Sequence, residues 1–269
     1  MFILPARSRA GFSLVEMLVV IAILGILVAI SIPMTRTAIL ASMQAQSSHN
    51  LRQLATANLA YAADHGYFVP ADDQTNNRRW HGSRSGTSQP FDPTEGYLSP
   101  YLGKSKRVSI CPLFAQMTQS DETFEDSTGG YGYNASYIGG TPEWAWKEDR
   151  TRKSAKPTQV RLASSTVMFT TTAYARAGGV QEYPYSEPPY WDLGNGPSGY
   201  RPSPSVHFRF KGKALVAWCD GHVSAETMQQ RSVGTNPHGG NAEEHQLGWF
   251  GPDAENGFWN PHRQSVFPR

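Results

Sequence analysis

The stretch Gly11-Phe12-Ser13-Leu14-Val15-Glu16 decides how the rest of the chain is organised. It separates a short leader, which carries Arg7 and Arg9, from an apolar run that extends to Pro33. Glu16 lies inside this run, where a carboxylate costs about 2.5–3.5 kcal/mol at the centre of a membrane helix and usually has a function. The stretch therefore predicts a membrane segment with a specific task.

The apolar segment is long enough to cross a bilayer. Residues 12–32 provide about 20 apolar positions, which span the hydrocarbon core as a helix. The basic leader is N-terminal, so the positive-inside rule keeps it in the cytoplasm and places the bulk of the chain outside. An ordinary secretory signal peptide is the alternative, because Ala29-Ile30-Ser31 resembles a small-x-small cleavage site. Glu16 and the Gly11-Phe12 junction argue against it.

The hexapeptide resembles the processing site of type IV prepilins, which carry Gly-Phe-Thr/Ser-Leu-Xaa-Glu before an apolar helix. The resemblance implies that prepilin peptidase cuts after Gly11 and that the new amino terminus of Phe12 is methylated. Glu16 would then pair with the Phe12 amine of a neighbouring subunit in a helical filament. Prepilin peptidase, related pilin subunits and the inner membrane are the partners that the resemblance implies.

Composition favours one large domain or one domain with an anchor, in a chain of 269 residues. The formal net charge is +2, from 24 basic and 22 acidic side chains. Removal of residues 1–11 takes away Arg7 and Arg9 and no acid, which leaves 22 of each sign and a mature charge of zero. No basic cluster or stripe indicates nucleic acid. The 25 glycines and 19 prolines favour a loop-rich β domain over a helical bundle.

A second helical segment is expected directly after the apolar run. Pro33 predicts a bend or local melting, residues 34–65 predict an amphipathic helix, and Gly66 predicts its end. The positions that recur at helical spacing are Leu40, Met43, Ser47, Leu51, Leu54, Asn58 and Tyr61. Residues 1–11 are thus the leader, 12–33 the transmembrane and assembly helix, 34–65 the amphipathic half, and 66–269 the loop-rich globular β domain.

The globular region offers few clear strands. Residues 131–138, 166–171 and 213–219 read as strands, and residues 222–225 as a return strand. Asp220-Gly221 predicts a type I′ hairpin turn between the last two. The predicted fold class is α+β: a long N-terminal helix packed on a small antiparallel β-sheet with large loops, as in pilins.

Scattered short matches add a narrower resemblance. Tyr131-Gly132-Tyr133-Asn134 and Asp220-Gly221-His222-Val223, among others, resemble pilin-like proteins and pseudopilins of planctomycetes and verrucomicrobia. Those proteins end with a His, nine residues and Asp-Gly. Here His207 is followed by twelve residues before Asp220-Gly221, so the role of His207 stays open.

Two further site questions remain open at this stage. Cys111 and Cys219 would lie outside the cytoplasm, where they form either a disulfide or two buried thiols. The pseudopilin resemblance admits a calcium ion, but the acidic loops lack the spacing of a defined calcium loop. Those loops contain Asp72-Asp73, Asp121-Glu122 and Asp253–Glu255.

The sequence predicts a structural subunit and not an enzyme. The first hypothesis is a pilin or pseudopilin, held in the inner membrane with its domain in the periplasm before it enters a filament, whether a secretion pseudopilus, a surface pilus or a DNA-uptake fibre. The alternative is a minor tip subunit that binds a surface or sugar through aromatic loops. The aromatic residues named for that role are Trp191, Trp249, Phe250, Phe258 and Trp259.

Overall fold

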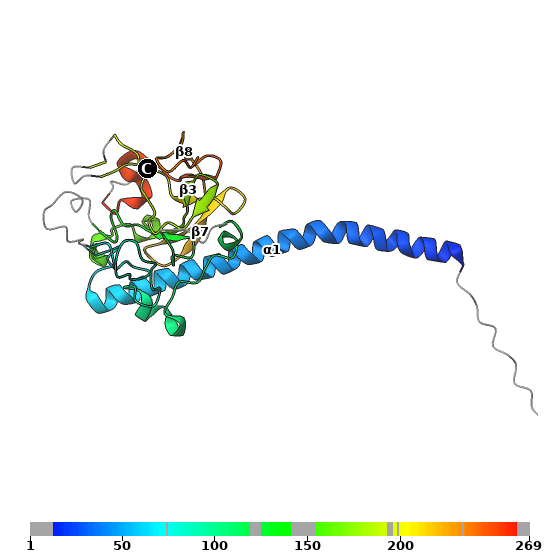
Figure 1. The fold of residues 1–269 in the computed structure, drawn as a ribbon, viewed down its shortest axis with the longest axis horizontal. Helices are drawn as coiled ribbons and strands as arrows, with labels where there is room; N and C mark the ends of the chain where they lie inside the picture. The colour runs from blue at the N-terminus through cyan, green and yellow to red at the C-terminus, as the bar shows by residue number, and fades with distance from the viewer. Residues whose placement is uncertain are drawn as a thin grey trace, which may run out of the picture. The chain divides into compact units, whose positions relative to one another are not determined.

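The computed structural model describes residues 13–73, 75–118, 125–140, 154–192, 196–197, 199–232 and 234–262. The chain divides into two compact units, Met1–Ser42 and Met43–Arg269. Helix α1 (Leu14–His65) starts in the first unit and ends in the second (Figure 1). Its backbone stays helical across Pro33, so the local melting expected there is absent.

The first unit is the apolar beginning of α1. Every side chain from Leu14 to Ile32 is exposed. The hydroxyls of Ser31 and Thr35 donate to the backbone carbonyls four residues earlier, at 2.7 and 2.8 Å. These bonds satisfy two polar groups inside the helix itself, which suits an apolar environment. In the described part of the chain, α1 is the one helix long and apolar enough to cross a membrane.

From Met43 onward α1 has one buried face, as its periodicity predicted. Ser47, Leu51, Leu54, Asn58 and Tyr61 are buried, while the opposite side is exposed. The amphipathic half was expected to start at residue 34. The buried face starts further along the helix than this, since residues 34–39 are still exposed.

The end of α1 also follows the prediction. Gly66 adopts φ +79° and donates its N–H to the carbonyl of Ala62 at 2.8 Å. A residue in this left-handed conformation closes a helix, and glycine adopts it without a steric penalty from a Cβ atom.

The second unit contains three small antiparallel sheets among its described residues. The largest has the order β1-β2-β6-β7, built from β1 (Tyr131–Tyr133), β2 (Val167–Thr171), β6 (Lys213–Trp218) and β7 (Val223–Thr227). The others are β3 (Tyr174–Arg176) with β4 (Gly179–Gln181), and β5 (Val206–His207), β9 (Leu247–Trp249) and β8 (Gln230–Arg231). A 3₁₀ segment, η7 (Ala254–Trp259), follows β9.

Strands β2 and β6 and the return strand β7 confirm the prediction, whereas β1 is shorter than expected. The strand predicted over residues 131–138 stops at Tyr133 because Asn134 turns the chain. The Asn134 Nδ2 donates to the carbonyls of Val167 and Trp259, both at 2.9 Å, and its Oδ1 accepts from Tyr137 N–H at 3.3 Å. A side chain that binds backbone groups in this way competes with strand pairing.

Three buried tryptophans organise a long segment without regular structure. The indole N–H groups of Trp80, Trp249 and Trp259 donate to the carbonyls of Pro184, Glu187 and Ser186, at 2.9, 3.1 and 2.9 Å. Each tryptophan is fully buried, so each indole both fills the core and satisfies a backbone carbonyl. Together with one parallel bridge between Tyr185 and Tyr133 of β1, these bonds let the segment pass through the interior.

The excursion between residues 71 and 96 is fixed by isolated bridges and by one buried ion pair. Bridges join Asp72 to Arg79, and Ser83 to Asp92. The Arg79 guanidinium pairs with the Glu125 carboxylate, and both side chains are almost fully buried. A buried cation needs such a partner to offset its desolvation.

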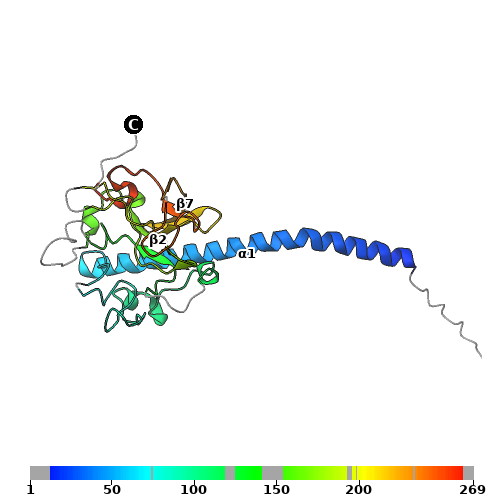
Figure 2. The ribbon, with the colours of Figure 1, turned by 45° about the horizontal axis from the view of Figure 1, so that its top comes forward.

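The second half of α1 packs against the four-stranded sheet and its surroundings (Figure 2). Asn50 Nδ2 donates to the Tyr131 hydroxyl at 3.1 Å, and Asn58 Oδ1 accepts from Val69 N–H at 2.9 Å. Tyr133 donates from its hydroxyl to the Val69 carbonyl at 3.0 Å. The predicted α+β architecture, a long helix packed on antiparallel sheet, is confirmed.

These contacts predict how far the helix can be shortened. A fragment that begins at Met43 keeps the buried face of α1, so we expect it to be soluble, monomeric and as heat-stable as one that begins at Met34. A fragment that begins at Leu51 loses buried Ser47 and Asn50 and should melt several degrees lower, at about 2–4 °C per kcal/mol for a domain of this size. Thermal unfolding followed by circular dichroism measures this. Aggregation of the Met34 fragment, or equal melting temperatures for all three fragments, would contradict the prediction that the buried face of α1 begins at about Met43.

Candidate assembly site

The first turn of α1 is built around Ser13 and Glu16. The Glu16 carboxylate accepts from the Ser13 backbone N–H at 2.8 Å, and the Ser13 hydroxyl accepts from Val15 N–H at 3.4 Å. Helix bonding starts with Met17 N–H to the Ser13 carbonyl at 3.2 Å. This arrangement is a variant of the capping box: Glu16, three residues after the cap, satisfies the Ser13 N–H, and the Ser13 hydroxyl satisfies the N–H of the second helical residue, Val15, and not that of the third.

The capping box was a signal that the sequence carried and that we missed, since Ser-x-x-Glu before an apolar run is its signature. It gives Glu16 a local structural role, because its carboxylate satisfies the N–H of the cap residue. It also turns the carboxylate toward the beginning of the helix, where the positive end of the helix dipole lies. The residues named for processing, Gly11 and Phe12, lie outside the described residues.

The hairpin at Asp220-Gly221 exists, but the predicted turn type is wrong. Gly221 N–H donates to the Trp218 carbonyl at 2.9 Å, so Cys219 and Asp220 occupy the central positions. Of these residues Gly221 alone has a positive φ, +91°. A type I′ turn needs positive φ at both central residues, whereas a three-residue loop closed by a left-handed glycine does not.

The structure pairs Asp220 with His222 and gives His207 a different setting. Asp220 Oδ1 lies 2.6 Å from His222 Nδ1, and the His222 ring stacks on Trp218 with centroids 5.7 Å apart. His207 is buried in β5, with its ring edge-on to Phe114. His222 is thus the histidine that contacts the Asp220 turn, and the role of His207 stays open.

Cys111 and Cys219 are two buried free thiols, so the disulfide that the sequence left open is not formed. The Cys111 sulfur accepts from the Ser47 hydroxyl on α1 at 3.1 Å. Cys219 follows β6 at the start of the hairpin turn, and its N–H donates to the Thr166 carbonyl at 2.9 Å. Burial raises the pKa of the Cys219 thiol well above its usual range, which keeps it neutral and inert.

The described residues provide no group of three or more His, Cys, Asp or Glu side chains that could hold a metal ion. Asp72 accepts from the Tyr185 hydroxyl at 2.7 Å, and Asp253 accepts from Arg201 at 3.2 Å. Asp121 and Glu122, two of the candidate calcium ligands, lie outside the described residues.

The aromatic binding face expected for a tip subunit is wrong. Trp249, Phe250 and Trp259 are fully buried and belong to the hydrophobic core, with Phe258 packed against it. Trp191 alone of the five is exposed, at 44%. Glycine and proline around these residues had suggested surface loops, but burial of large aromatic rings contributes more to folding than most other side chains.

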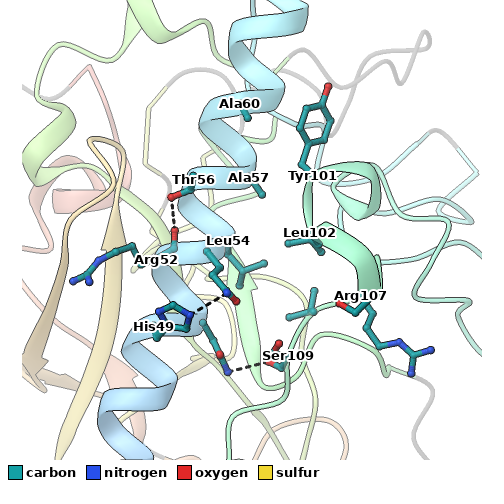
Figure 3. A pocket seen from close by; sticks show the side chains of 15 residues that line it. His49, Arg52, Leu54, Thr56, Ala57, Ala60, Tyr101, Leu102, Arg107 and Ser109 are labelled. Carbon is teal, nitrogen blue, oxygen red and sulfur yellow. Dashed lines mark hydrogen bonds between the residues drawn. The ribbon is translucent and has the colours of Figure 1, made fainter.

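A groove runs between α1 and the segment from Tyr101 to Ser109, and is here called the α1 groove (Figure 3). Its volume is about 480 Å³. Residues from His49 to Ala60 of α1 form one wall, and residues from Tyr101 to Ser109 form the other. Leu54, Ala57 and Leu102 lie along it, with Leu54 and Ala57 almost fully buried, and the side chains of Arg52 and Arg107 point away from it in Figure 3.

Comparison with known proteins identifies the N-terminal segment. Residues 6–32 match the family model described as the prokaryotic N-terminal methylation motif. The match includes Gly11, Phe12, Ser13 and Glu16 and implies processing by prepilin peptidase. No curated protein and no solved structure matches the chain. The pilin-like α+β architecture and this motif both indicate a precursor that is anchored in the membrane by its N-terminal helix.

Two buried histidines predict a loss of stability in acid. Burial lowers the pKa of His81 and of His207 well below 6.5, and nearby Arg79 and Arg84, or Arg209 and His245, lower it further. Both ring nitrogens of His81 lack a hydrogen-bond partner among the described residues.

Because the folded-state pKa lies below the unfolded one, the stabilisation is present above about pH 6.5 and is lost as the pH falls. Wild type should lose up to about 1.4 kcal/mol of unfolding free energy per pH unit relative to His81→Leu. Urea unfolding of the Met34 fragment and its variant at pH 7.5, 6.5, 5.5 and 4.5 measures the difference. The prediction would be contradicted if the unfolding free energy changed with pH by the same amount in the wild-type fragment and in His81→Leu.

Proposed function

We propose that the chain is a structural subunit of a pilus-like or pseudopilus filament. Prepilin peptidase removes residues 1–11, the new amino terminus at Phe12 is methylated, and the subunit waits in the inner membrane with its domain in the periplasm. Its N-terminal helix then leaves the lipid and packs against the helices of other subunits. The observation that carries the proposal is the methylation motif over residues 6–32.

The exposure of α1 supports this proposal. Side chains such as Leu14, Ile21 and Leu24 are 79%, 64% and 54% exposed. Soluble monomers rarely leave so large a continuous apolar surface in water. A helix that is apolar all round fits lipid, and it fits equally well the interior of a bundle of identical helices. The same surface can therefore serve the precursor and the filament.

The position of Glu16 supports a role in assembly. Its carboxylate points to the start of the helix, where it accepts from Ser13 N–H. Cleavage after Gly11 would create a cationic amine one residue before Ser13, close to the same helix end. A carboxylate and an amine that are buried together attract each other, and a subunit out of register would leave either charge unpaired at a cost of about 3–5 kcal/mol.

The proposal is structural and not catalytic. The protein is the substrate of the peptidase, and proteins with the pilin-like architecture are generally non-enzymatic. The aromatic tip-adhesin alternative loses its support, because most of the aromatic rings on which it depended are in the core.

Glu16→Gln tests the proposal because it separates charge from capping. Glutamine can still accept from Ser13 N–H as the third helical residue of a capping box, but it carries no charge. We expect this variant to be folded, processed and inserted, yet to form few or no filaments by electron microscopy and shearing.

Ser13→Ala is the matched control. It removes the cap hydroxyl and keeps the Glu16 charge, so we expect filaments near wild-type number despite a loss of about 1 kcal/mol of helix capping. Wild-type filament numbers with Glu16→Gln would exclude the carboxylate as the register device. Loss of filaments in Ser13→Ala alone would assign the effect to helix capping.

A further inference from the structure

We propose that a phospholipid of the periplasmic leaflet binds along one face of α1, with an acyl chain beside residues 24–32 and its phosphate on Arg36. This inference rests on the membrane-anchored precursor of the proposed function, and it names the lipid contact that fixes the depth of that precursor in the membrane. All the residues that form the contact belong to the first unit of the chain, Met1–Ser42.

A shallow hollow runs along this face of α1 and is here called the lipid groove. Its volume is about 390 Å³. Its apolar side chains are each more than half exposed, and they are Leu24, Leu27, Val28 and Ile32. Arg36 also lines the groove and is the last of its residues along the helix. The groove is therefore apolar over most of its length and cationic at one end, which matches an acyl chain followed by a phosphate.

The length of the lipid groove matches one leaflet of a bilayer. From residue 24 to residue 36 the helix rises about 18 Å, at about 1.5 Å per residue. Half of the hydrocarbon core of a bilayer is about 15 Å thick. An acyl chain of one leaflet can therefore lie along the groove while its headgroup reaches Arg36.

The charges that flank the apolar segment indicate which leaflet is concerned. Residues 17–35 carry no charge, and Glu16 and Arg36 lie at the two ends of this stretch, 20 residues apart. This separation is about 30 Å of helix, which equals the thickness of the hydrocarbon core. With Glu16 at the cytoplasmic boundary, Arg36 lies at the periplasmic boundary, where a long arginine side chain reaches the headgroups.

The polar groups of the lipid groove differ in their need for a partner. The hydroxyls of Ser31 and Thr35 donate to carbonyls of α1 itself, at 2.7 and 2.8 Å. The Arg36 guanidinium is exposed and has no hydrogen-bond or ion-pair partner among the described residues. A guanidinium offers a planar fork of N–H donors that fits a phosphate in a bidentate way. The group that is left to bind an outside partner is thus a phosphate binder.

A second copy of α1 fits the lipid groove less well while both copies are in the membrane. Two copies at the same depth place Arg36 beside Arg36, and like charges repel. The nearest acidic residues of α1 on either side are Glu16 and Asp64, 20 and 28 residues away. They lie about 30 and 42 Å along the helix, too far to neutralise Arg36 of a neighbour at the same depth. A lipid phosphate supplies the missing negative charge.

Photo-crosslinking in vesicles tests the lipid contact. The full chain is reconstituted in vesicles of equal parts phosphatidylcholine and phosphatidylglycerol, with a trace of phosphatidylglycerol that carries a diazirine halfway along one acyl chain. Mass spectrometry then locates the lipid adducts. We expect about fivefold more adducts at Val28 and Ile32, in the groove, than at Ile26 and Ile30 on the opposite face, because one arginine near the surface favours an anionic headgroup by about this factor.

Variants at Arg36 separate the phosphate contact from simple contact with lipid. Arg36→Gln keeps a polar side chain but removes the charge, so adducts on the two faces should become equal. Arg36→Lys keeps a phosphate-binding cation and should retain most of the preference. Arg52→Gln is the matched control, because it makes the same charge change on α1 outside the lipid groove, and it should behave as wild type.

Vesicles without phosphate provide an independent comparison. Both the bulk lipid and the photoreactive lipid are replaced by digalactosyldiacylglycerol, which has similar acyl chains and an uncharged sugar headgroup. The apolar part of the groove can still accept a chain, but Arg36 has no phosphate to bind. We expect adducts throughout residues 14–32 with no preference for the groove.

The outcomes separate this inference from the function on which it rests. Equal adducts on both faces in wild type would overturn the lipid site, and so would an unchanged preference in Arg36→Gln or in the phosphate-free vesicles. Loss of the preference in Arg52→Gln would overturn it as well, since the effect would then come from overall charge. In each case adducts within α1 would leave the membrane anchor standing. No adducts in residues 14–32 of wild type would overturn both the lipid site and the membrane-anchored precursor.

Discussion

Helix α1 is stable in two different environments, an apolar one around its first half and the folded domain around its second half. The rest of the structure depends on this constraint. The domain buries one face of α1 from about Met43 to Ala62, whereas from Leu14 to Ile32 every side chain is exposed. Hydrogen bonds within the helix satisfy the backbone in both parts, and Ser31 and Thr35 satisfy their hydroxyls in the same way. The exposed part therefore needs no protein contact in lipid, and it can exchange lipid for other helices without breaking a polar contact.

The domain around the second half of α1 is stabilised more by individual side-chain contacts than by long strands. Its strands have two to six residues, so many backbone groups need partners from elsewhere. Buried tryptophan N–H groups and the amides of Asn58 and Asn134 provide these partners. Such a domain depends on the identity of a few residues and tolerates long surface loops.

The sequence predicted the features that show a hydrophobic periodicity or a short turn or capping motif. The helix, its end at Gly66, strands β2 and β6 and the β6–β7 hairpin were all recognised, because each has a pattern within a few residues. Strands of two or three residues, such as β5 and β9, are too short for alternation to be visible. The burial of Trp249 and Trp259 was missed because their partners, at Glu187 and Ser186, are more than 60 residues away in the chain. The Asp220–His222 pair and the Ser13–Glu16 cap also have local signals, because the partners are two and three residues apart, but neither was predicted.

The central claim is that the chain becomes an assembly subunit when its N-terminus is created at Phe12. Intact-mass and N-terminal fragment analysis of the protein purified from membranes tests it most directly. The account predicts a mature chain that begins at Phe12, carries one methyl group on its amine and retains the whole apolar segment. A mature chain that begins at Ile32 would contradict it, because cleavage there is the work of a signal peptidase and removes the helix on which assembly depends.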